Sequence, residues 1–351
     1  MKRIFTAIFI FFLLLPNLAS GRNFLHLHSE NGVYLMDVPK STLNRDILVT
    51  TTILQGAARE NRARDMRFGY GGDAVFDQMI RLTKDGNSLQ IEKPSVVSDN
   101  TAKSIYSKFT QLAMSPIVAA FPIKKENDST YTIDMTSFLK QDNPLVSLSG
   151  AKEELKLGEY DDAKSYVEGT VCYPENINIR SYRAYKTRDE KEDPNGTNWL
   201  VGTSWFLLPK TPMMPQLTDM RVGYFSTPVA GTIFRDDYLI PEVRYANRWR
   251  LEPKAEDLAK YRQGELVEPQ KQIVFYIDRA TPGYLVPYFI KAVEAWNPVF
   301  EKAGFKHAIT AKLAPTAEED STYSEEDIRY SLISYKASPI PNAYGPMVVD
   351  P

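Results

Sequence analysis

Short runs of β-branched and aromatic residues, separated by turn residues, recur from Phe24 to Leu208. The segments Asp46–Ile53 and Tyr131–Met135 are typical of strands. Few windows in this part repeat their apolar residues every three or four positions, which is the spacing of a helix face. The pattern therefore predicts a β-rich N-terminal region with little helix.

The pattern changes after Gln270. The segment Ile273–Asp278 is predicted to be an apolar strand with both faces covered. Residues 285–303 are predicted to form an amphipathic helix. Its apolar stripe would consist of Phe289, Val293, Trp296, Phe300 and Ala303. Two more strands are expected at 307–313 and 328–335. The order strand, helix, strand, strand predicts a layered α/β unit.

Three finer expectations concern this unit. Pro298 removes one hydrogen bond inside the helix, so we expect a kink near Asn297. Gly304 is expected to cap the helix with a positive φ. The acidic stretch Glu318–Asp327 is expected to be a solvated loop.

The segment 209–270 is rich in Pro and Arg and is expected to connect the two parts. Within it, Arg244, Arg248 and Arg250 surround Trp249. These residues form either a cation–aromatic cluster or, as we prefer, arginines that lie over a core tryptophan.

The N-terminus has the three parts of a secretory signal peptide. Met1–Arg3 is basic, residues 4–15 are apolar, and small residues follow at 18–21. We expect residues 1–20 to be a signal peptide and the protein to be periplasmic or secreted. The apolar run is shorter than the roughly 20 residues that span a bilayer, so no membrane anchor is expected.

Composition limits the partners. The formal net charge of −2 gives no basis for electrostatic binding of nucleic acid, so no such partner is expected. Cys172 is the only cysteine, so the fold must hold without an internal disulfide. We expect its thiol to behave as a small buried hydrophobe. No sequence feature indicates an oligomeric state.

Catalytic motifs are missing from the sequence. His26 and His28 would share one face of a strand and could chelate a metal, but no cysteine or third histidine accompanies them. We therefore interpret them as part of a mobile N-terminal strand. Neither H-E-x-x-H nor G-x-S-x-G occurs. Paired carboxylates at 318–320 and 325–327 leave open a carboxylate-based hydrolase. We predict no catalytic residue, no metal ligand and no cofactor for this chain alone.

Six phrases in order carry a resemblance to a known family. They are DMRVGYF at 219–225, RWRLEP at 248–253, QIVFYIDRATP at 272–282, AVEAWNPVFEKAGF at 292–305, DIRYS at 327–331 and GPMVVDP at 345–351. Together they resemble a bacterial family of exported zinc-dependent metallopeptidases of the metzincin type. In that family a β-rich region of unknown function precedes the catalytic domain.

The resemblance implies a division of the chain. Residues 21–60 would be a short N-terminal β segment, 61–208 the β-rich domain of unknown function and 209–270 the connection. Residues 271–351 would be the first half of a metzincin-like α/β catalytic domain, whose order is strand, helix, strand, strand and edge strand. The zinc helix of the family would follow, so the chain is expected to be truncated and inactive by itself.

The resemblance also implies a substrate-binding edge strand. Its residues would be Ala343, Tyr344, Gly345, Pro346 and Met347. In metzincins an extended substrate pairs with this strand through main-chain hydrogen bonds. The alternative is an ordinary edge strand that Pro341 and Pro346 protect from further pairing.

Two functions remain open, and with them the question of whether this chain is an enzyme. The first is the N-terminal part of an exported zinc endopeptidase, which in full length would use zinc to hydrolyse a peptide or protein substrate. The second is a stand-alone exported β-rich protein that binds a peptide or a glycan, which is compatible with an aromatic content of 12%.

Overall fold

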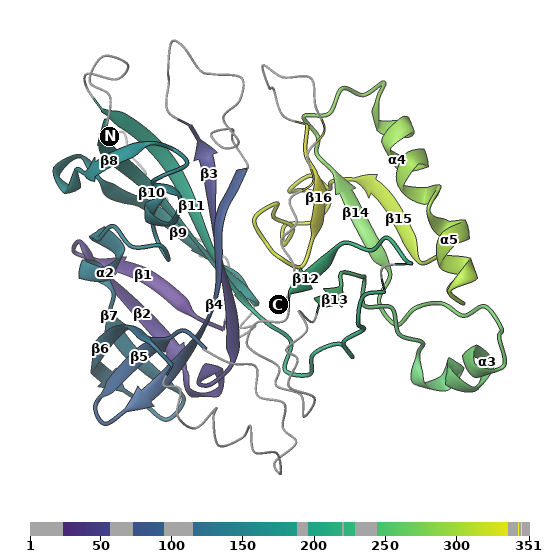
Figure 1. Ribbon diagram of the computed structural model, residues 1–351, viewed down its shortest axis with the longest axis horizontal. Coiled ribbons are helices and arrows are strands. Elements are labelled where there is room, and N and C mark those ends of the chain that lie inside the picture. The colour runs from purple at the N-terminus through teal and green to yellow at the C-terminus, as the bar shows by residue number, and fades with distance from the viewer. Residues whose placement is uncertain are drawn as a thin grey trace, which may run out of the picture.

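The computed structural model describes residues 24–56, 73–94, 115–187, 196–219, 221–228, 244–335, 343 and 345. Figure 1 shows a large curled sheet on one side and a smaller α/β unit on the other. The expected signal peptide, residues 1–20, lies outside the described residues. In the described part of the chain, no helix is long and apolar enough to cross a membrane.

The large sheet is antiparallel throughout and confirms the expected β-rich region. Its strands are β1 (His26–Glu30), β2 (Val33–Pro39), β3 (Asp46–Gln55), β4 (Asp73–Asp85), β5 (Ser88–Glu92), β6 (Ile117–Glu126), β7 (Thr130–Asp134), β8 (Leu157–Tyr160), β9 (Tyr166–Cys172), β10 (Asn176–Thr187) and β11 (Thr197–Leu207). Their order is β1-β2-β7-β6-β5-β4-β3-β11-β10-β8, and β9 also pairs with β10. The expected segments 21–60 and 61–208 therefore share one sheet.

Alternation of side chains builds the core of this sheet. In β11, every second residue from Thr197 to Trp205 is buried, because successive side chains of a strand point to opposite faces. Trp205 belongs to a core cluster with strands β1 and β2, whereas Trp199 packs in a second cluster with Tyr185. The short helix α2 (Thr136–Lys140) contributes Phe138 and Leu139 to the first cluster.

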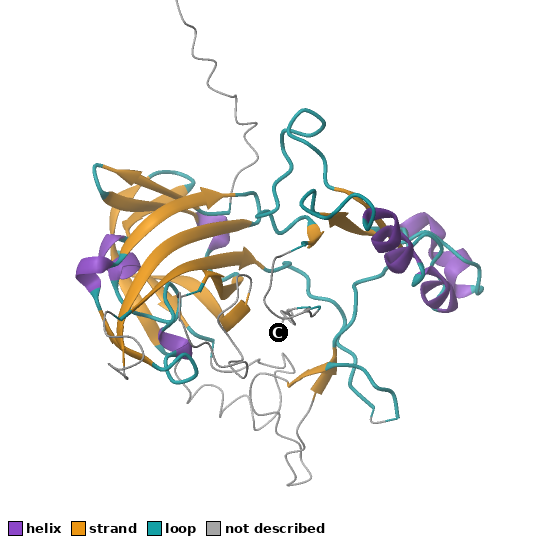
Figure 2. Cartoon of the chain, turned by 90° about the horizontal axis from the view of Figure 1, so that it is seen from above, coloured by secondary structure: helices purple, strands orange, loops and turns teal. Residues whose placement is uncertain are grey.

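Figure 2 shows the curl of the large sheet, and hydrogen bonds show that its strands β1 and β9 meet. The amide of Leu27 donates to Sγ of Cys172 over 3.3 Å, and the carbonyl of Leu27 accepts a bond from Oγ1 of Thr170 over 3.2 Å. An edge strand otherwise presents unpaired backbone groups. Burial raises the pKa of the Cys172 thiol, which therefore stays protonated at neutral pH. Side chains of β9 thus bind the backbone of β1, although the two strands form no backbone ladder with each other. We call this contact the seam.

The connecting segment contains two short paired strands, β12 (Ser226–Pro228) and β13 (Arg244–Ala246). Our interpretation of its arginines was wrong. Trp249 is 49% exposed and meets the ring of Phe275 edge-on. Arg248 donates to the carbonyl of Met214, and Arg250 donates to that of Thr211. Extended chain leaves carbonyls without ladder partners, and guanidinium groups supply the donors.

The α/β unit has the expected element order. Strand β14 (Ile273–Ile277) lies between β15 (Ile309–Leu313) and β16 (Ser331–Ile333), and both neighbours run parallel to it. Three short helices accompany the sheet, α3 (Leu258–Arg262), α4 (Val286–Glu294) and α5 (Asn297–Lys302). Figures 1 and 2 place α4 and α5 on the side away from the β-rich sheet.

The expected single helix is in fact two. The α-helical hydrogen-bond pattern is interrupted at Ala295 and Trp296, near the expected kink, although both residues keep helical φ and ψ. Pro298 occupies the first turn of α5, where it costs no hydrogen bond. Gly304 caps α5 with φ +93°, as predicted, and the amide of Phe305 donates to the carbonyl of Phe300.

The expected apolar stripe is only partly buried, because Phe289, Val293 and Phe300 are half-buried. Trp296 lies in the break between the helices and is 59% exposed, and Ala303 is exposed too. No side chain of α4 or α5 is fully buried, because a sheet of three short strands offers the helices little surface. Strand β14 is likewise buried only at Ile273 and Ile277, and its three middle residues are half-buried. The prediction that both faces of this strand are covered was therefore wrong for the middle residues.

Gly196 and Gly32 have nearly equal φ but different surroundings. Replacing each by alanine therefore distinguishes the cost of backbone strain from the cost of a steric collision. Gly196 has φ +77° and Gly32 has φ +79°. A Cβ at Gly196 would collide with the carbonyl oxygen of Tyr185, whereas a Cβ at Gly32 would meet nothing within 4 Å. Both replacements by alanine strain φ by about 1–2 kcal/mol.

We expect Gly196→Ala to cost about 1–3 kcal/mol more than Gly32→Ala, because the collision adds to the strain. Urea unfolding of the two variants measures the difference. Equal unfolding midpoints would contradict the contact with Tyr185.

Candidate functional site

The predicted substrate-edge residues are only partly described. Ala343 and Gly345 are exposed and lie outside any strand. Tyr344, Pro346 and Met347 lie outside the described residues. The edge strand therefore stays a prediction.

An aromatic group covers part of the α/β sheet. The ring of Tyr276 in β14 contacts those of Tyr323 and Tyr330, with centroids 5.2 and 5.4 Å away. Lys312 places its ammonium 5.0 Å from the centroid of the Tyr276 ring. Burial raises the pKa of Tyr323 to about 12, so this phenol is neutral at physiological pH.

The loop that carries Tyr323 also joins the α/β unit to the β-rich sheet. The amide groups of Asn176 and Asn178 both donate to the carbonyl of Glu326, over 2.9 and 2.8 Å. The side-chain oxygen of Asn176 accepts the backbone N–H of Ile328 over 3.1 Å. Asn176 is fully buried. We call these contacts the asparagine joint.

Two further groups support the joint. The hydroxyls of Tyr173 and Ser324 lie 2.6 Å apart. Burial raises the pKa of the Tyr173 phenol, and the charges of Glu326 and Asp327 also raise it. The phenol therefore stays neutral and available as a hydrogen-bond donor.

The acidic stretch is not solvated throughout, contrary to our expectation. Asp327 is 1% exposed. Arg329 binds both of its carboxylate oxygens through Nε and Nη2, at distances down to 2.6 Å. A bidentate guanidinium stabilises a buried carboxylate, which explains why this acid turns inward. The loop therefore holds its shape where it meets the joint.

A hollow of about 420 Å³ opens on the β-rich sheet beside two stacked tyrosines. The rings of Tyr166 in β9 and Tyr182 in β10 are 5.2 Å apart and 13° from parallel. Glu168 also lines the hollow, and its carboxylate pairs with Arg180 over 3.1 Å. Tyr166 is 53% exposed, so its face is open to a ligand.

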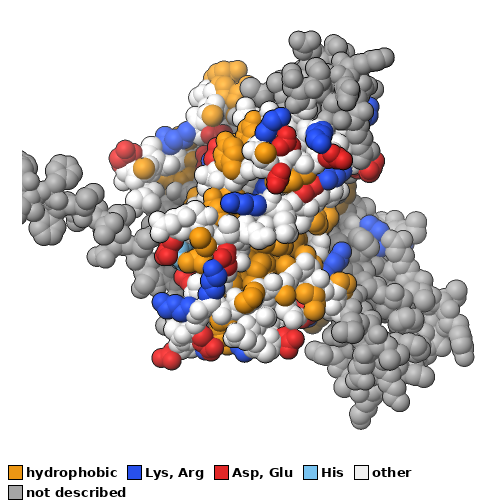
Figure 3. All heavy atoms as spheres, turned by 90° about the vertical axis from the view of Figure 1, so that its left-hand side faces the viewer, with side chains coloured by type: hydrophobic (Ala, Val, Ile, Leu, Met, Phe, Trp, Pro, Cys, Tyr) orange, Lys and Arg blue, Asp and Glu red, His pale blue; other side chains and the backbone are white. Residues whose placement is uncertain are grey.

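Sequence reasoning missed this pair, because the tyrosines become neighbours only through the register of β9 and β10. Figure 3 shows one face of the β-rich part, where acidic, basic and hydrophobic side chains are mixed.

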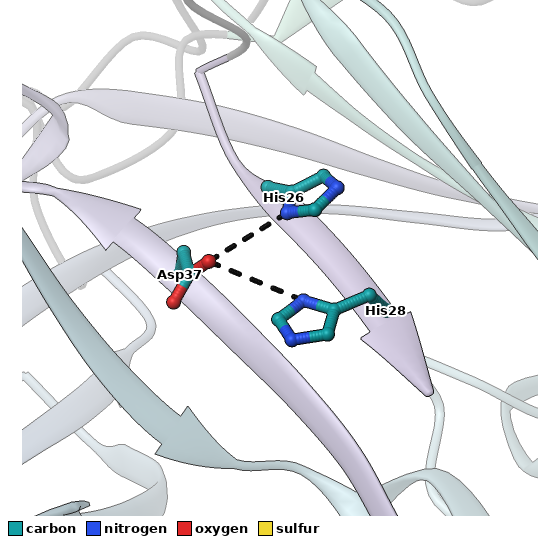
Figure 4. Close-up of side chains that lie close together, drawn as sticks. All are labelled: His26, His28 and Asp37. Atoms are coloured by element: carbon teal, nitrogen blue, oxygen red, sulfur yellow. Dashed lines mark ion pairs between the residues drawn. The ribbon is translucent and has the colours of Figure 1, made fainter. Parts of the chain in front are cut away.

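His26 and His28 lie on one face of β1, and Asp37 of β2 lies opposite His26 (Figure 4). One ligand atom from each residue can be chosen so that all three lie within 4.8 Å of one another. The sequence interpretation noted the histidines but overlooked Asp37. The signal was present in Asn31–Gly32, whose two positive φ values form the tight turn that sets this register.

Our interpretation of β1 as a mobile strand also needs correction. Leu25, next to the strand, is fully buried, Leu27 is 3% exposed, and the strand pairs with β2 along its whole length. The two histidines therefore stand on a fixed part of the sheet.

Comparison with known proteins found one family. A model described as a domain of unknown function (DUF5117) matches residues 72–254, which is more than half of the chain. No curated protein and no solved structure matches the chain.

The asparagine joint predicts how tightly the α/β unit is held. Asn176→Ala leaves the amide of Ile328 and the carbonyl of Glu326 short of partners, so we expect docking of the 323–328 loop to weaken by about 1–3 kcal/mol. Hydrogen exchange at the Ile328 amide measures this loss.

The matched control is Asn178→Ala, which removes an exposed hydrogen bond to the same carbonyl and the bond that Asn178 accepts from Asn176, but leaves both bonds of Asn176 to the loop. Its effect should be clearly smaller. Unchanged protection of Ile328 in Asn176→Ala would show that the joint does not hold the unit.

Proposed function

The chain belongs to the family of the domain of unknown function DUF5117, and on that premise we propose that it is the N-terminal part of an exported zinc-dependent endopeptidase. The observation that supports the proposal is the α/β unit. Its β14, α4, α5, β15 and β16 follow the element order expected at the start of a metzincin catalytic domain. The six ordered phrases of the sequence give further support.

Residues 271–351 would begin the catalytic domain under this proposal. In metzincin-type enzymes the zinc ion activates the water that hydrolyses the peptide bond. The sequence of this chain contains no H-E-x-x-H, so its residues do not fit that zinc site and no catalytic step is assigned to them. The chain by itself is expected to be inactive.

The β-rich part would serve as the support of the catalytic unit. The asparagine joint connects β10 to the loop before β16, so it fixes the orientation of the α/β sheet. Residues 343–347 would pair with a peptide or protein substrate through backbone hydrogen bonds. Export to the periplasm or the medium is part of the same proposal.

A second candidate is an exported binding protein for a peptide or a glycan. The stacked Tyr166 and Tyr182 beside an open hollow favour it. Aromatic faces bury large areas with little loss of side-chain freedom, and Glu168 beside them adds a hydrogen-bond acceptor.

The endopeptidase proposal is tested on the protein that the gene produces in its own cells. We expect the coding sequence to continue beyond codon 351 into an H-E-x-x-H motif, and the purified product to cleave unfolded protein substrates until a zinc chelator is added. The 351-residue chain is the control and should not cleave. Absence of that motif downstream, or cleavage by the 351-residue chain alone, would refute the proposal.

The binding-protein candidate predicts a ligand for the tyrosine pair. On glycan and peptide arrays, we expect Tyr182→Ala to weaken the binding of any specific ligand about two- to tenfold, since one aromatic contact contributes about 0.5–1.5 kcal/mol. Tyr288→Ala is the control, because this tyrosine is 68% exposed on α4, away from the hollow. Equal affinities of the two variants would count against the hollow as a binding site.

A further inference from the structure

We propose that His26, His28 and Asp37 form a binding site for one divalent transition-metal ion of the zinc type. The site lies on the outer face of the hairpin formed by β1 and β2. This inference does not depend on the proposed function, because none of the three residues belongs to the α/β unit. It differs from the sequence interpretation, in which the two histidines lacked a third ligand.

The positions of the ligand atoms are near those that a metal requires. Nδ1 of His26 and Nδ1 of His28 lie 3.6 and 4.0 Å from Oδ2 of Asp37, as the dashed lines in Figure 4 show. Metal–ligand bonds of about 2.0–2.1 Å in tetrahedral geometry place two ligand atoms roughly 3.3 Å apart. The two imidazole rings are stacked, with centroids 4.9 Å apart and 22° between their planes, so both rings would rotate out of the stack to direct all three atoms at one ion.

His28 points to a missing partner at this place. Its Nδ1 is buried and has no hydrogen-bond partner. The other ring nitrogen, Nε2, lies 3.5 Å from Oε1 of Glu30. Histidines that ligate a metal usually donate their second N–H to a carboxylate, which fixes the tautomer and directs the free lone pair at the ion. In His28 the carboxylate of Glu30 lies near Nε2 at an ion-pair distance, which leaves Nδ1 as the ligand atom.

Asp37 has an outer partner as well. Its Oδ1 accepts a hydrogen bond of 2.5 Å from Oγ1 of Thr132 in β7. This bond leaves Oδ2 free to face the two histidines. Carboxylates that ligate a metal are commonly held in the same way. Residues of three neighbouring strands, β1, β2 and β7, thus hold the proposed ligands in place before a metal binds.

The types of ligand determine which class of metal ion the site would bind. Two imidazoles and one carboxylate suit zinc, nickel, cobalt or copper ions, whereas magnesium and calcium prefer oxygen ligands. The side chains of His26, His28 and Asp37 are 53%, 27% and 33% exposed. The site is therefore reachable from solvent, and water would complete the coordination.

A bound ion would tie strand β1 to β2 at the edge of the curled sheet. The opposite face of β1 carries Leu27, whose backbone forms the seam with β9. An ion that binds the folded hairpin and not the unfolded chain raises the melting temperature. Metal affinity and thermal stability should therefore change together.

The test is zinc binding by the full chain without a polyhistidine tag. We expect isothermal titration with Zn²⁺ alone to show one ion per chain, and an excess of Zn²⁺ to raise the melting temperature. His28→Gln and Asp37→Asn should each weaken binding at least tenfold and remove the thermal shift. Thr132→Val should weaken binding less, because it removes only the support of Asp37.

His307→Gln is the matched control, because this third histidine is exposed on the α/β unit. It should bind zinc as the parent chain does. If His28→Gln or Asp37→Asn has a lower melting temperature than the parent chain without metal, His26→Gln takes its place, because His26 is the most exposed of the three ligands. No binding by the parent chain, or equal affinity of the parent and all ligand variants, would overturn the proposal.

Discussion

Closure of the curled sheet at Leu27 is the constraint on which the β-rich part depends. An antiparallel sheet of eleven strands has edges, and here side chains of β9 satisfy the backbone of the first strand. The seam encloses the larger core cluster, in which Trp205 and Leu27 are both buried. It also fixes the outward face of β1, where the two histidines stand. The hydroxyl of Tyr34 adds a bond from β2 to the carbonyl of Val167 in β9, so the seam spans two strands.

Much of the fold could be predicted, because alternation, helix caps and apolar runs are local patterns. The segment Ile273–Ile277 is a strand, and Gly304 caps its helix as expected. The exposure of Trp296 could not be predicted, because the spacing of apolar residues shows which of them share a helix face but not how much sheet surface lies beneath that face. The role of Asn176 in the joint could not be predicted for another reason. Its partners lie some 150 residues away and are backbone groups, which leave no mark in the sequence.

The candidate sites lie within the range that the family of unknown function covers and on both sides of it. The stacked tyrosines and the two asparagines of the joint lie within residues 72–254, whereas the loop that these asparagines bind belongs to the α/β unit. The histidine–aspartate group lies before this range, and the α/β unit lies after it. The range that matches the family therefore contains the two stacked tyrosines and the β-rich side of the joint. Metal chemistry and peptidase chemistry, as proposed, would come from its flanks.

The asparagine joint has a consequence for the order of folding. Asn176 begins β10, an interior strand of the large sheet, and its partners leave the ribosome about 150 residues later. Contacts between such distant residues form after local ones. The seam at Leu27 and Cys172 spans 145 residues, nearly as many as the joint, so both contacts depend on segments that are far apart in the chain. The α/β unit can dock through the joint only when β10 and the 323–328 loop are both formed.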